Sequence, residues 1–333
     1  MKPTLLTLVA LAILASPAPA VDALSELADY QYGQDQASLL AVEREVERSM
    51  ADPARQAAMA GKLLAVMADP EATLAGKQHA AIYLRMCGGK PEAPALAGML
   101  KDDALCEFAR GALERIPAPA AGKALRDALA DLKGPALLGV INSTANRGDR
   151  EAVGPLMALT ADDDTTIRLA AAHALGRIGG AVATSCLKRL AGPDRDVTFA
   201  HAYLACGFIA LEEGDRAAAT AVFDALAQAD YPAPVRRGAL AGELRLVADP
   251  AALLARWLAG DDQAARRVAV NHLDGQTTEW LQALCKDKPV GDAICFAEVL
   301  AERGGAAALP ILLAAARQED DPSLRIRGLM ALG

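Results

Sequence analysis

The sequence predicts an all-α protein, an α-solenoid superhelix of about nine to ten stacked helical hairpins. Hydrophobic residues make up 53% of its 333 residues but aromatic residues only 4%, so alanine and leucine dominate the apolar content. Such a composition suits closely packed helices, because alanine has the highest helix propensity and a small side chain. Few segments show the alternating β-branched pattern of strands. Helical segments also recur at intervals of about 31 residues.

The first twenty residues form a separate segment with the pattern of a secretory signal peptide. Lys2 supplies a positive charge, an apolar run spans 5–14, and Ala18-Pro19-Ala20 fits a cleavage site that leaves Val21 as the mature N-terminus. The apolar run is too short to span a bilayer, although an uncleaved anchor is the rival interpretation. We therefore expect an exported protein, in the periplasm or outside the cell, with no membrane insertion after cleavage.

After a short lead-in at 21–35, one apolar pattern is repeated over residues 36–333. In "IRLAAAHALGRIGG" the apolar positions are Ile167, Ala170 or Ala171, Ala174 or Leu175, and Ile178. This i, i+3/4, i+7/8, i+11 spacing is that of an amphipathic helix. One hairpin cannot bury such a stripe alone, whereas stacked neighbours can.

The repeated segments follow one another in a regular order along the chain. Those with the long apolar stripe (segments B) lie at 77–89, 102–116, 136–149, 164–180, 198–211, 235–247, 261–273, 291–305 and 320–333. Shorter helical stretches (segments A) lie between them at 93–100, 151–159, 182–190, 216–226, 249–258, 277–285 and 307–316. A less regular helix pair precedes them at 39–50 and 55–67.

The segment "DTTIRLAAAHALGRIGG", with Asp-x-x-x-Arg and Leu-Gly-x-Ile-Gly, resembles the short HEAT-like repeats first named from phycobilisome lyases. The resemblance covers about residues 36–333, and the period of about 31 is shorter than that of longer HEAT repeats. It implies an α-solenoid but no particular function, because such repeats serve unrelated roles. The segment "YQYGQDQASLLAVEREV" also resembles the start of exported multidomain bacterial proteins that carry HEAT-like arrays.

An aspartate lies at the start of three B segments, and each has an arginine four residues further on. An aspartate at a helix start accepts backbone N–H bonds, and the arginine can add an i, i+4 ion pair. The alternative is a ladder of anion-binding arginines, which requires free guanidinium groups. We favour the structural role for Asp164 with Arg168, Asp262 with Arg266, and Asp321 with Arg325.

The histidines do not form a metal-binding pattern. His79, His173, His201 and His272 fall in different repeats, and no His-Glu or His-x-x-x-His pair occurs. Deoxyhypusine hydroxylase, an iron enzyme built on the same repeat, depends on His-Glu motifs, so that role is not carried over. No G-x-S-x-G, P-loop or G-x-G-x-x-G motif is present. We expect no catalytic residue, metal or cofactor.

Six cysteines in an exported chain raise the question of disulfides. Cys285 and Cys295 flank a turn near residue 290 at similar distances, so antiparallel helices bring them abreast, and they are the predicted pair. Cys186 and Cys206 flank another turn with a mismatch of about four residues, or about 6 Å along a helix. The alternative is that all six cysteines are buried apolar fillers.

The leading hypothesis is a non-enzymatic protein-binding or scaffolding module with an unidentified protein partner. The formal charge of −8, without a basic block, argues against nucleic acid as a partner. Alternatives are a HEAT-like lyase, a metal-dependent oxidoreductase, or a spacer in a larger carbohydrate-active or redox enzyme. The candidate binding residues are polar positions of B segments on the expected concave face: Arg110, Glu114, Asn142, His173, Arg177, Tyr203 and Asn271.

The last B segment stops early. Residues 322–333 match 165–176, but counterparts of Ile178 and of the two glycines after it are missing. Because the last hairpin of a solenoid normally carries a polar cap, we expect the native chain to continue past Gly333 into further repeats or another domain.

Overall fold

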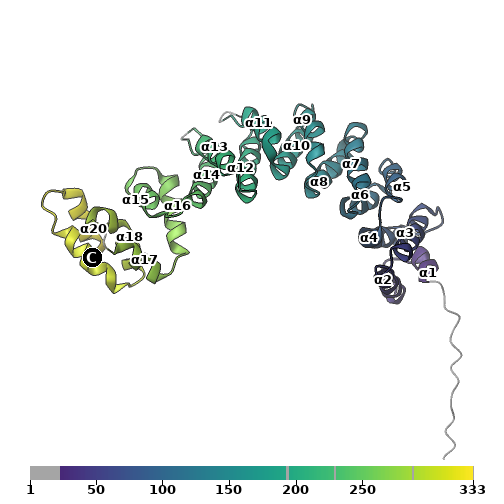
Figure 1. Ribbon diagram of the computed structural model, residues 1–333, viewed down its shortest axis with the longest axis horizontal. Coiled ribbons are helices and arrows are strands. Elements are labelled where there is room, and N and C mark those ends of the chain that lie inside the picture. The colour runs from purple at the N-terminus through teal and green to yellow at the C-terminus, as the bar shows by residue number, and fades with distance from the viewer. Residues whose placement is uncertain (1–22, 193–194, 229, 287–288, 333) are drawn as a thin grey trace, which may run out of the picture. The chain divides into compact units, whose positions relative to one another are not determined.

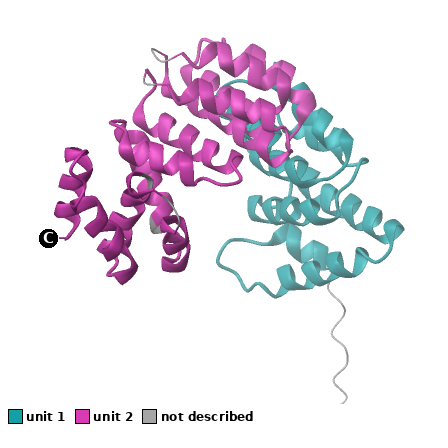
Figure 2. Ribbon diagram, turned by 60° about the vertical axis from the view of Figure 1, so that its left-hand side comes forward, with its two compact units in different colours: residues 1–147 teal, residues 148–333 magenta. Residues whose placement is uncertain are grey.

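The computed structural model is all-helical, as predicted, and divides into two compact units, 1–147 and 148–333 (Figures 1 and 2). The structure describes residues 23–192, 195–228, 230–286 and 289–332. The predicted signal peptide, 1–20, lies outside them. Within these ranges, no helix combines the length and the apolar character that crossing a membrane requires.

The first unit contains eight α-helices in the part of it that the structure describes. They are α1 (Ala23–Asp29), α2 (Ala37–Ser49), α3 (Pro53–Ala68), α4 (Leu74–Cys87), α5 (Ala93–Met99), α6 (Cys106–Arg115), α7 (Pro119–Asp131) and α8 (Gly134–Asn146). The B helices α4, α6 and α8 pack side by side, and α5 packs against α7 on the other layer. Each B helix also contacts the A helix that precedes it, which gives the two-layered stack expected of helical hairpins.

Two helices of this unit were missed by the sequence analysis. Helix α1 lies inside the segment interpreted as a lead-in, and α7 begins at the second of two nearby prolines, Pro117 and Pro119, which resemble a turn. Pro119 is in fact the first residue of α7, a position where proline fits because its missing N–H has no partner there. The buried Leu125 and Leu129 give α7 the apolar face of an ordinary A helix.

The second unit continues the alternation of A and B helices. Its helices are α9 (Val153–Leu159), α10 (Thr165–Ile178), α11 (Gly180–Leu190), α12 (Val197–Glu212), α13 (Arg216–Leu226), α14 (Ala233–Leu246), α15 (Ala251–Ala259), α16 (Gln263–Asp274), α17 (Thr278–Cys285), α18 (Val290–Glu302), α19 (Leu309–Ala316) and α20 (Pro322–Leu332). Helices α10, α12, α14 and α16 pack in sequence, each against the next, and α18 packs against α15, α17, α19 and α20.

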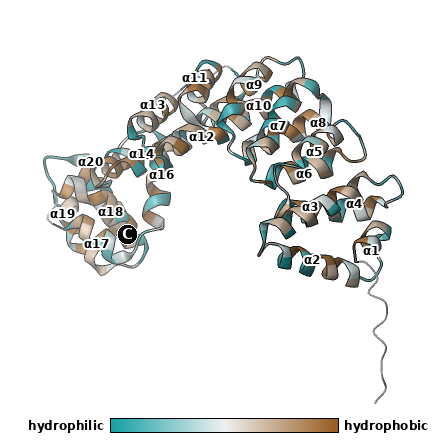
Figure 3. Cartoon of the chain, turned by 45° about the vertical axis from the view of Figure 1, so that its right-hand side comes forward, coloured by the Kyte–Doolittle hydropathy of each residue, from teal (hydrophilic) through white to brown (hydrophobic). Residues whose placement is uncertain are grey.

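The core follows the predicted apolar stripe. In α10, Ile167, Ala171, Leu175 and Ile178 are all buried, and Leu175 is 0% exposed. Figure 3 shows apolar and polar residues on different sides of the helices in both units. The predicted register is therefore confirmed for α10, because its apolar stripe, spaced by the 3.6-residue period of an α-helix, is buried.

The aspartates before the B helices act as N-caps. The Asp164 carboxylate accepts a hydrogen bond from the backbone N–H of Thr166 at 2.7 Å, and Asp262 accepts one from Ala264 at 2.9 Å. Asp321 likewise accepts from the N–H of Leu324. Each bond satisfies a backbone donor that has no partner within the helix.

The predicted ion pairs with the arginines four residues on are replaced by other contacts. Arg168 donates to the carbonyl oxygens of Asp162 and Asp163 in the preceding turn, at 2.7 and 3.0 Å. Arg266 donates to the carbonyl of Gly260, six residues earlier, at 2.8 Å. These arginines therefore hold the turn before the helix through its backbone carbonyl groups.

Asp262 has a different partner from the one predicted. Its carboxylate forms an ion pair with Arg236 of the preceding B helix, not with Arg266. For the third predicted pair, the backbone N–H of Arg325 donates to the carbonyl of Asp321 at 3.0 Å, an ordinary first-turn helix bond. The Asp262–Arg236 pair links α14 to α16, which the i, i+4 spacing within one helix could not reveal.

A second arginine contact joins consecutive repeats at the other end of the B helices. Arg147, which follows α8, donates to the carbonyls of Leu113 and Ile116 at the end of α6, at 2.8 and 2.7 Å. Arg303, which follows α18, donates to Leu273 and Gln276 at the end of α16, at 2.6 and 2.8 Å. The last carbonyls of a helix lack internal partners, and these arginines supply them.

The structure contains no disulfide between Cys285 and Cys295. All six cysteines are buried thiols. The antiparallel pairing of α17 and α18 does bring Cys285 close to α18, where its Sγ lies 4.0 Å from the carbonyl oxygen of Ala293. The arrangement matches the alternative in which cysteines fill small apolar spaces in the core.

We expect the thiols to be unreactive in the folded protein. Burial raises the pKa of Cys87, Cys206 and Cys295 to about 11, so the reactive thiolate is scarce at pH 8. Ellman's reagent at pH 8 should detect no rapidly reacting thiol in the native protein and all six in denaturant without reductant. Detection of four thiols in denaturant would instead reveal a disulfide.

Candidate functional site

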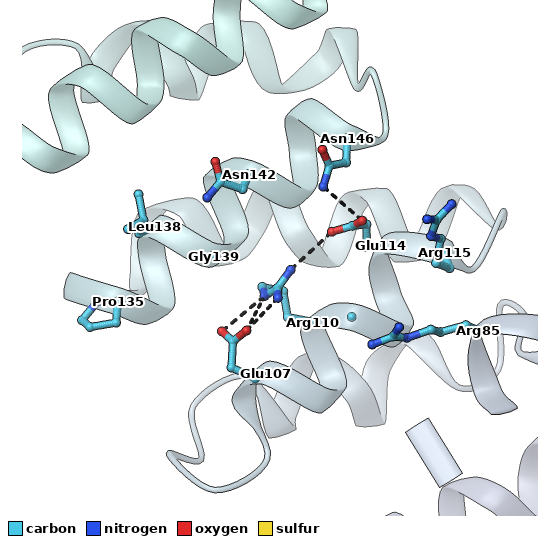
Figure 4. A pocket seen from close by; sticks show the side chains of 11 residues that line it. Arg85, Glu107, Arg110, Glu114, Arg115, Pro135, Leu138, Gly139, Asn142 and Asn146 are labelled. Atoms are coloured by element: carbon cyan, nitrogen blue, oxygen red, sulfur yellow. Dashed lines mark hydrogen bonds and ion pairs between the residues drawn. The ribbon is translucent and has the colours of Figure 1, made fainter. Parts of the chain in front are cut away.

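A pocket of about 540 Å³ lies over the B helices α4, α6 and α8 of the first unit (Figure 4). Three of the predicted binding residues, Arg110, Glu114 and Asn142, lie together in it. Its lining consists of Arg85, Glu107, Arg110, Gly111, Glu114, Arg115, Pro135, Leu138, Gly139, Asn142 and Asn146.

Arg110 is held at the centre of this pocket by three partners. Its guanidinium donates to the Glu107 carboxylate at 2.6 Å, to Glu114 at 3.3 Å and to the Ser143 hydroxyl at 2.7 Å. Its hydrogen bond to Glu107 raises the pKa of Arg110, so the group stays charged at any physiological pH. With its donors occupied and its side chain only partly exposed, Arg110 organises the pocket instead of presenting a free cation.

Glu114 connects α6 to α8. One carboxylate oxygen accepts from the Ser143 hydroxyl at 2.8 Å, and the other accepts from the amide of Asn146 at 3.1 Å. Ser143 is 0% exposed, so its hydroxyl depends entirely on these protein partners. The network fixes the two helices and the polar side chains on them in one arrangement.

Arg85 and Arg115 are the exposed cations of the pocket (Figure 4). A Cβ atom on Gly111 would lie 2.5 Å from the guanidinium of Arg85, so Arg85 lies close against α6 at this glycine, and a larger residue there would shift the end of the Arg85 side chain. Neither arginine has a carboxylate partner in the described part of the chain. Together with the exposed Asn142, they present hydrogen-bond donors to the pocket.

The other predicted binding residues lie in the second unit and do not share this pocket. His173 and Arg177 are exposed on α10, and Asn271 lines a different pocket on α16. Tyr203 was wrongly predicted as a surface residue: it is 2% exposed, and burial raises its pKa. Helix α12 contacts α10, α11, α13 and α14, so it has almost no solvent-exposed side on which Tyr203 could lie.

The described residues contain no group of three or more histidine, cysteine, aspartate or glutamate side chains that could hold a metal ion. Two histidines instead pack against aromatic rings. His79 meets Tyr30 edge-on with ring centroids 5.3 Å apart, and His272 meets Trp280 at 6.1 Å. Burial lowers the pKa of His79, which favours the neutral form of its ring.

Part of the pocket could have been found in the sequence. Glu107, Arg110 and Glu114 follow i, i+3 and i+7 spacing, which places the three side chains on one side of a helix. Ser143 and Asn146 belong to the next repeat, and Arg85 to the previous one. Their contribution depends on how three helices pack, which no local pattern contains.

The sequence model of the HEAT repeats matches residues 119–207, which cover α7 to the middle of α12. No curated protein matches the chain significantly.

Three solved structures are distantly similar. The complex of CpcE and CpcF of phycocyanin lyase from Nostoc sp. PCC7120 is 21% identical, covers 72% of this chain and 93% of its own, and has a TM-score of 0.38. Human deoxyhypusine hydroxylase in complex with glycerol is 20% identical, with coverages of 73% and 95% and a TM-score of 0.35. An engineered protein is 16% identical, with coverages of 94% and 98% and a TM-score of 0.38.

At these identities and scores, the structural likenesses transfer no activity, partner or cofactor to this chain. The assignment depends on the match at 119–207 and on the repeated hairpins with a common apolar stripe on both sides of it. This chain is a HEAT-like repeat protein.

Proposed function

We propose that the chain is a non-enzymatic, exported protein-binding or scaffolding module, and that the pocket over α4, α6 and α8 is a binding surface for its partner. The observation that supports this most is the division of roles among the arginines. Arg110 is fixed by Glu107, Glu114 and Ser143, while Arg85 and Arg115 remain exposed in the same pocket.

A pocket organised in this way favours binding because its central polar groups, Arg110 and Glu114, are fixed before a partner arrives. Side chains already held in place lose little conformational entropy on association. The volume of about 540 Å³ falls in the usual range for ligand sites. Guanidinium groups beside the amides of Asn142 and Asn146 suit the carboxylates and peptide groups of a polypeptide.

The Ser143–Glu114–Arg110 contacts resemble part of a catalytic constellation, but burial argues for a structural role. A nucleophilic serine must reach the substrate, and the side chain of Ser143 is fully buried. Its hydroxyl both accepts from Arg110 and donates to Glu114, so it links the two helices.

Export is the part of the proposal that the N-terminal pattern supports. The positive Lys2, the apolar run and Ala18-Pro19-Ala20 indicate cleavage before Val21. The partner is then expected in the cell envelope or medium, and a protein purified from the source should begin at Val21. A cytoplasmic protein that begins at Met1 would contradict this.

The binding surface can be tested with a charge-reversal variant. Arg85→Glu/Arg115→Glu leaves the Arg110 network intact and reverses the two exposed charges. Affinity capture with the exported chain should identify a partner, and titration calorimetry with that purified partner should show affinity reduced by about tenfold or more.

The matched control is Lys90→Glu/Lys188→Glu, which changes the same charge at exposed positions outside the pocket. It should retain the affinity of the unsubstituted chain. Equal affinity of the two double variants would exclude this pocket as the binding surface, and turnover of a candidate substrate by the purified chain would contradict a non-enzymatic role.

A further inference from the structure

The second unit has its own polar pocket, of about 690 Å³, on the B helices α14 and α16. Three arginines line it and no acidic residue does, although the chain as a whole carries a formal charge of −8. The lining residues are Ala233, Arg237, Gln263, Ala264, Arg266, Arg267, Val270 and Asn271. None of the residues with a structural role in the first pocket contributes to it.

Only one of these three arginines has a structural task. Arg266 donates to the carbonyl of Gly260. Arg236, which occupies the equivalent position in the preceding repeat and does not line the pocket, pairs with Asp262. Arg237 and Arg267 have no comparable hydrogen bond or ion pair with any described residue. Two guanidinium groups with unused donors therefore face the same pocket.

Arg237 and Arg267 occupy equivalent positions in consecutive repeats. "VRRGA" in α14 and "ARRVA" in α16 place the second arginine at the same point of each B helix, and the two helices pack against each other. Neighbouring like charges repel, so an empty pocket of this kind carries an uncompensated positive potential. An anionic ligand would neutralise it.

The arrangement suits two carboxylates on one extended chain. Packed helices lie about 8–10 Å apart, and side chains of residues i and i+2 in an extended segment point the same way about 7 Å apart. Each guanidinium can receive a carboxylate through two parallel hydrogen bonds. The amides of Gln263 and Asn271 can bond to peptide groups, and Val270 offers an apolar contact.

We propose that the α14–α16 pocket binds an acidic polypeptide segment with carboxylates on alternate residues, one for Arg237 and one for Arg267. Its volume of about 690 Å³ exceeds what a single small oxyanion fills, and its amide and apolar lining adds contacts for the peptide groups and side chains of a polypeptide. The proposal extends the proposed function to a second site, and it stands whether or not the α4–α6–α8 pocket binds a partner.

Fluorescence anisotropy with the full chain tests this directly. The probe is a fluorescein-labelled peptide of four Gly-Glu repeats, and its counterpart has four Gly-Gln repeats. The Gly-Glu peptide should bind at low ionic strength and weaken as salt is added, and the Gly-Gln peptide should bind at least about tenfold more weakly.

Two double variants separate the pocket from general charge effects. Arg237→Gln/Arg267→Gln should weaken Gly-Glu binding by about tenfold or more, whereas Lys188→Gln/Arg189→Gln removes two exposed charges on α11 and should change little. If the first variant melts at a lower temperature, Arg237→Lys/Arg267→Lys replaces it in the binding measurement. Lysine keeps the positive charge but lacks the two parallel N–H donors with which a guanidinium binds a carboxylate.

Three outcomes would overturn the proposal. The first is equal affinity of unsubstituted chain and Arg237→Gln/Arg267→Gln for the Gly-Glu peptide. The second is equal affinity for the Gly-Glu and Gly-Gln peptides. The third is complete displacement of the peptide by an equal concentration of inorganic phosphate, which would identify a small-anion site. Because synthetic peptides replace the natural partner, failure here leaves the test of the first pocket unaffected.

Discussion

Replacement of Leu175 by aspartate is expected to unfold the repeats around α10. Leu175 is 0% exposed at the centre of the apolar stripe of this helix. Truncation to alanine alone removes buried methyl groups and should cost about 2–5 kcal/mol of unfolding free energy. Aspartate adds an unpaired buried charge, so Leu175→Asp should be more destabilising than Leu175→Ala.

The damage should be local, because each repeat contacts only its neighbours. Hydrogen exchange should show lost protection in α10 and in α12, which packs directly against it. Val182→Asp is the matched control: it introduces the same charge in the adjacent α11 at a side chain that is 61% exposed. A melting curve of Leu175→Asp that matches that of Val182→Asp would show that α10 is wrongly placed.

Substitution of Gly176, the next residue, is expected to separate α10 from α12. A Cβ atom on Gly176 would lie 2.6 Å from the carbonyl oxygen and 2.8 Å from the Cα of Ala202. These are backbone atoms of α12, so no side-chain rotation relieves the clash. Gly176→Ala should therefore destabilise by about 1–3 kcal/mol, and Gly176→Val by more, even though alanine is the better helix former.

Gly61 provides a control with the opposite sign. It lies in the middle of α3, and a Cβ atom there would meet nothing within 4 Å. Gly61→Ala should stabilise the protein by about 0.5–1 kcal/mol, because alanine loses less backbone entropy in a helix. Denaturant unfolding measures both effects. Stabilisation by Gly176→Ala would contradict the close approach of α10 and α12.

The two pockets show how much of a candidate site can be predicted from the sequence. Arg110 and Glu114 were predicted as candidate binding residues because polar residues off an apolar stripe usually lie on the exposed side of a helix, and both line the first pocket. Their fixed geometry was not, since it depends on Ser143 in the following repeat. The prediction that Tyr203 lies on the surface was wrong, because a position off the apolar stripe is buried when other helices also cover that side of its helix.

For the charged residues, too, the sequence predicts contacts within one helix but not contacts with another repeat or turn. The sequence shows an aspartate and an arginine four residues apart before several B helices, and the cap at Asp262 follows from that pattern. It does not show that Asp262 pairs with Arg236 from the helix before it, or that Arg266 bonds to a carbonyl, because these partners come from another repeat or from a turn. The two unused guanidinium groups at Arg237 and Arg267 emerge only when those contacts are known.

Local order was thus readable from the amino-acid sequence alone. The 3.6-residue spacing of apolar side chains and the capping aspartates identify most of the helices and their buried sides, since each depends on neighbours within one or two helical turns. The period of about 31 residues then indicates that these helices stack as repeated hairpins. Tertiary packing decided the rest. It determines that the cysteines remain free thiols, that the backbone of α12 approaches α10 at Gly176, and which polar side chains meet in a pocket. Those outcomes depend on distances of a few ångströms between residues about 30 apart in sequence, and helical periodicity does not specify such distances.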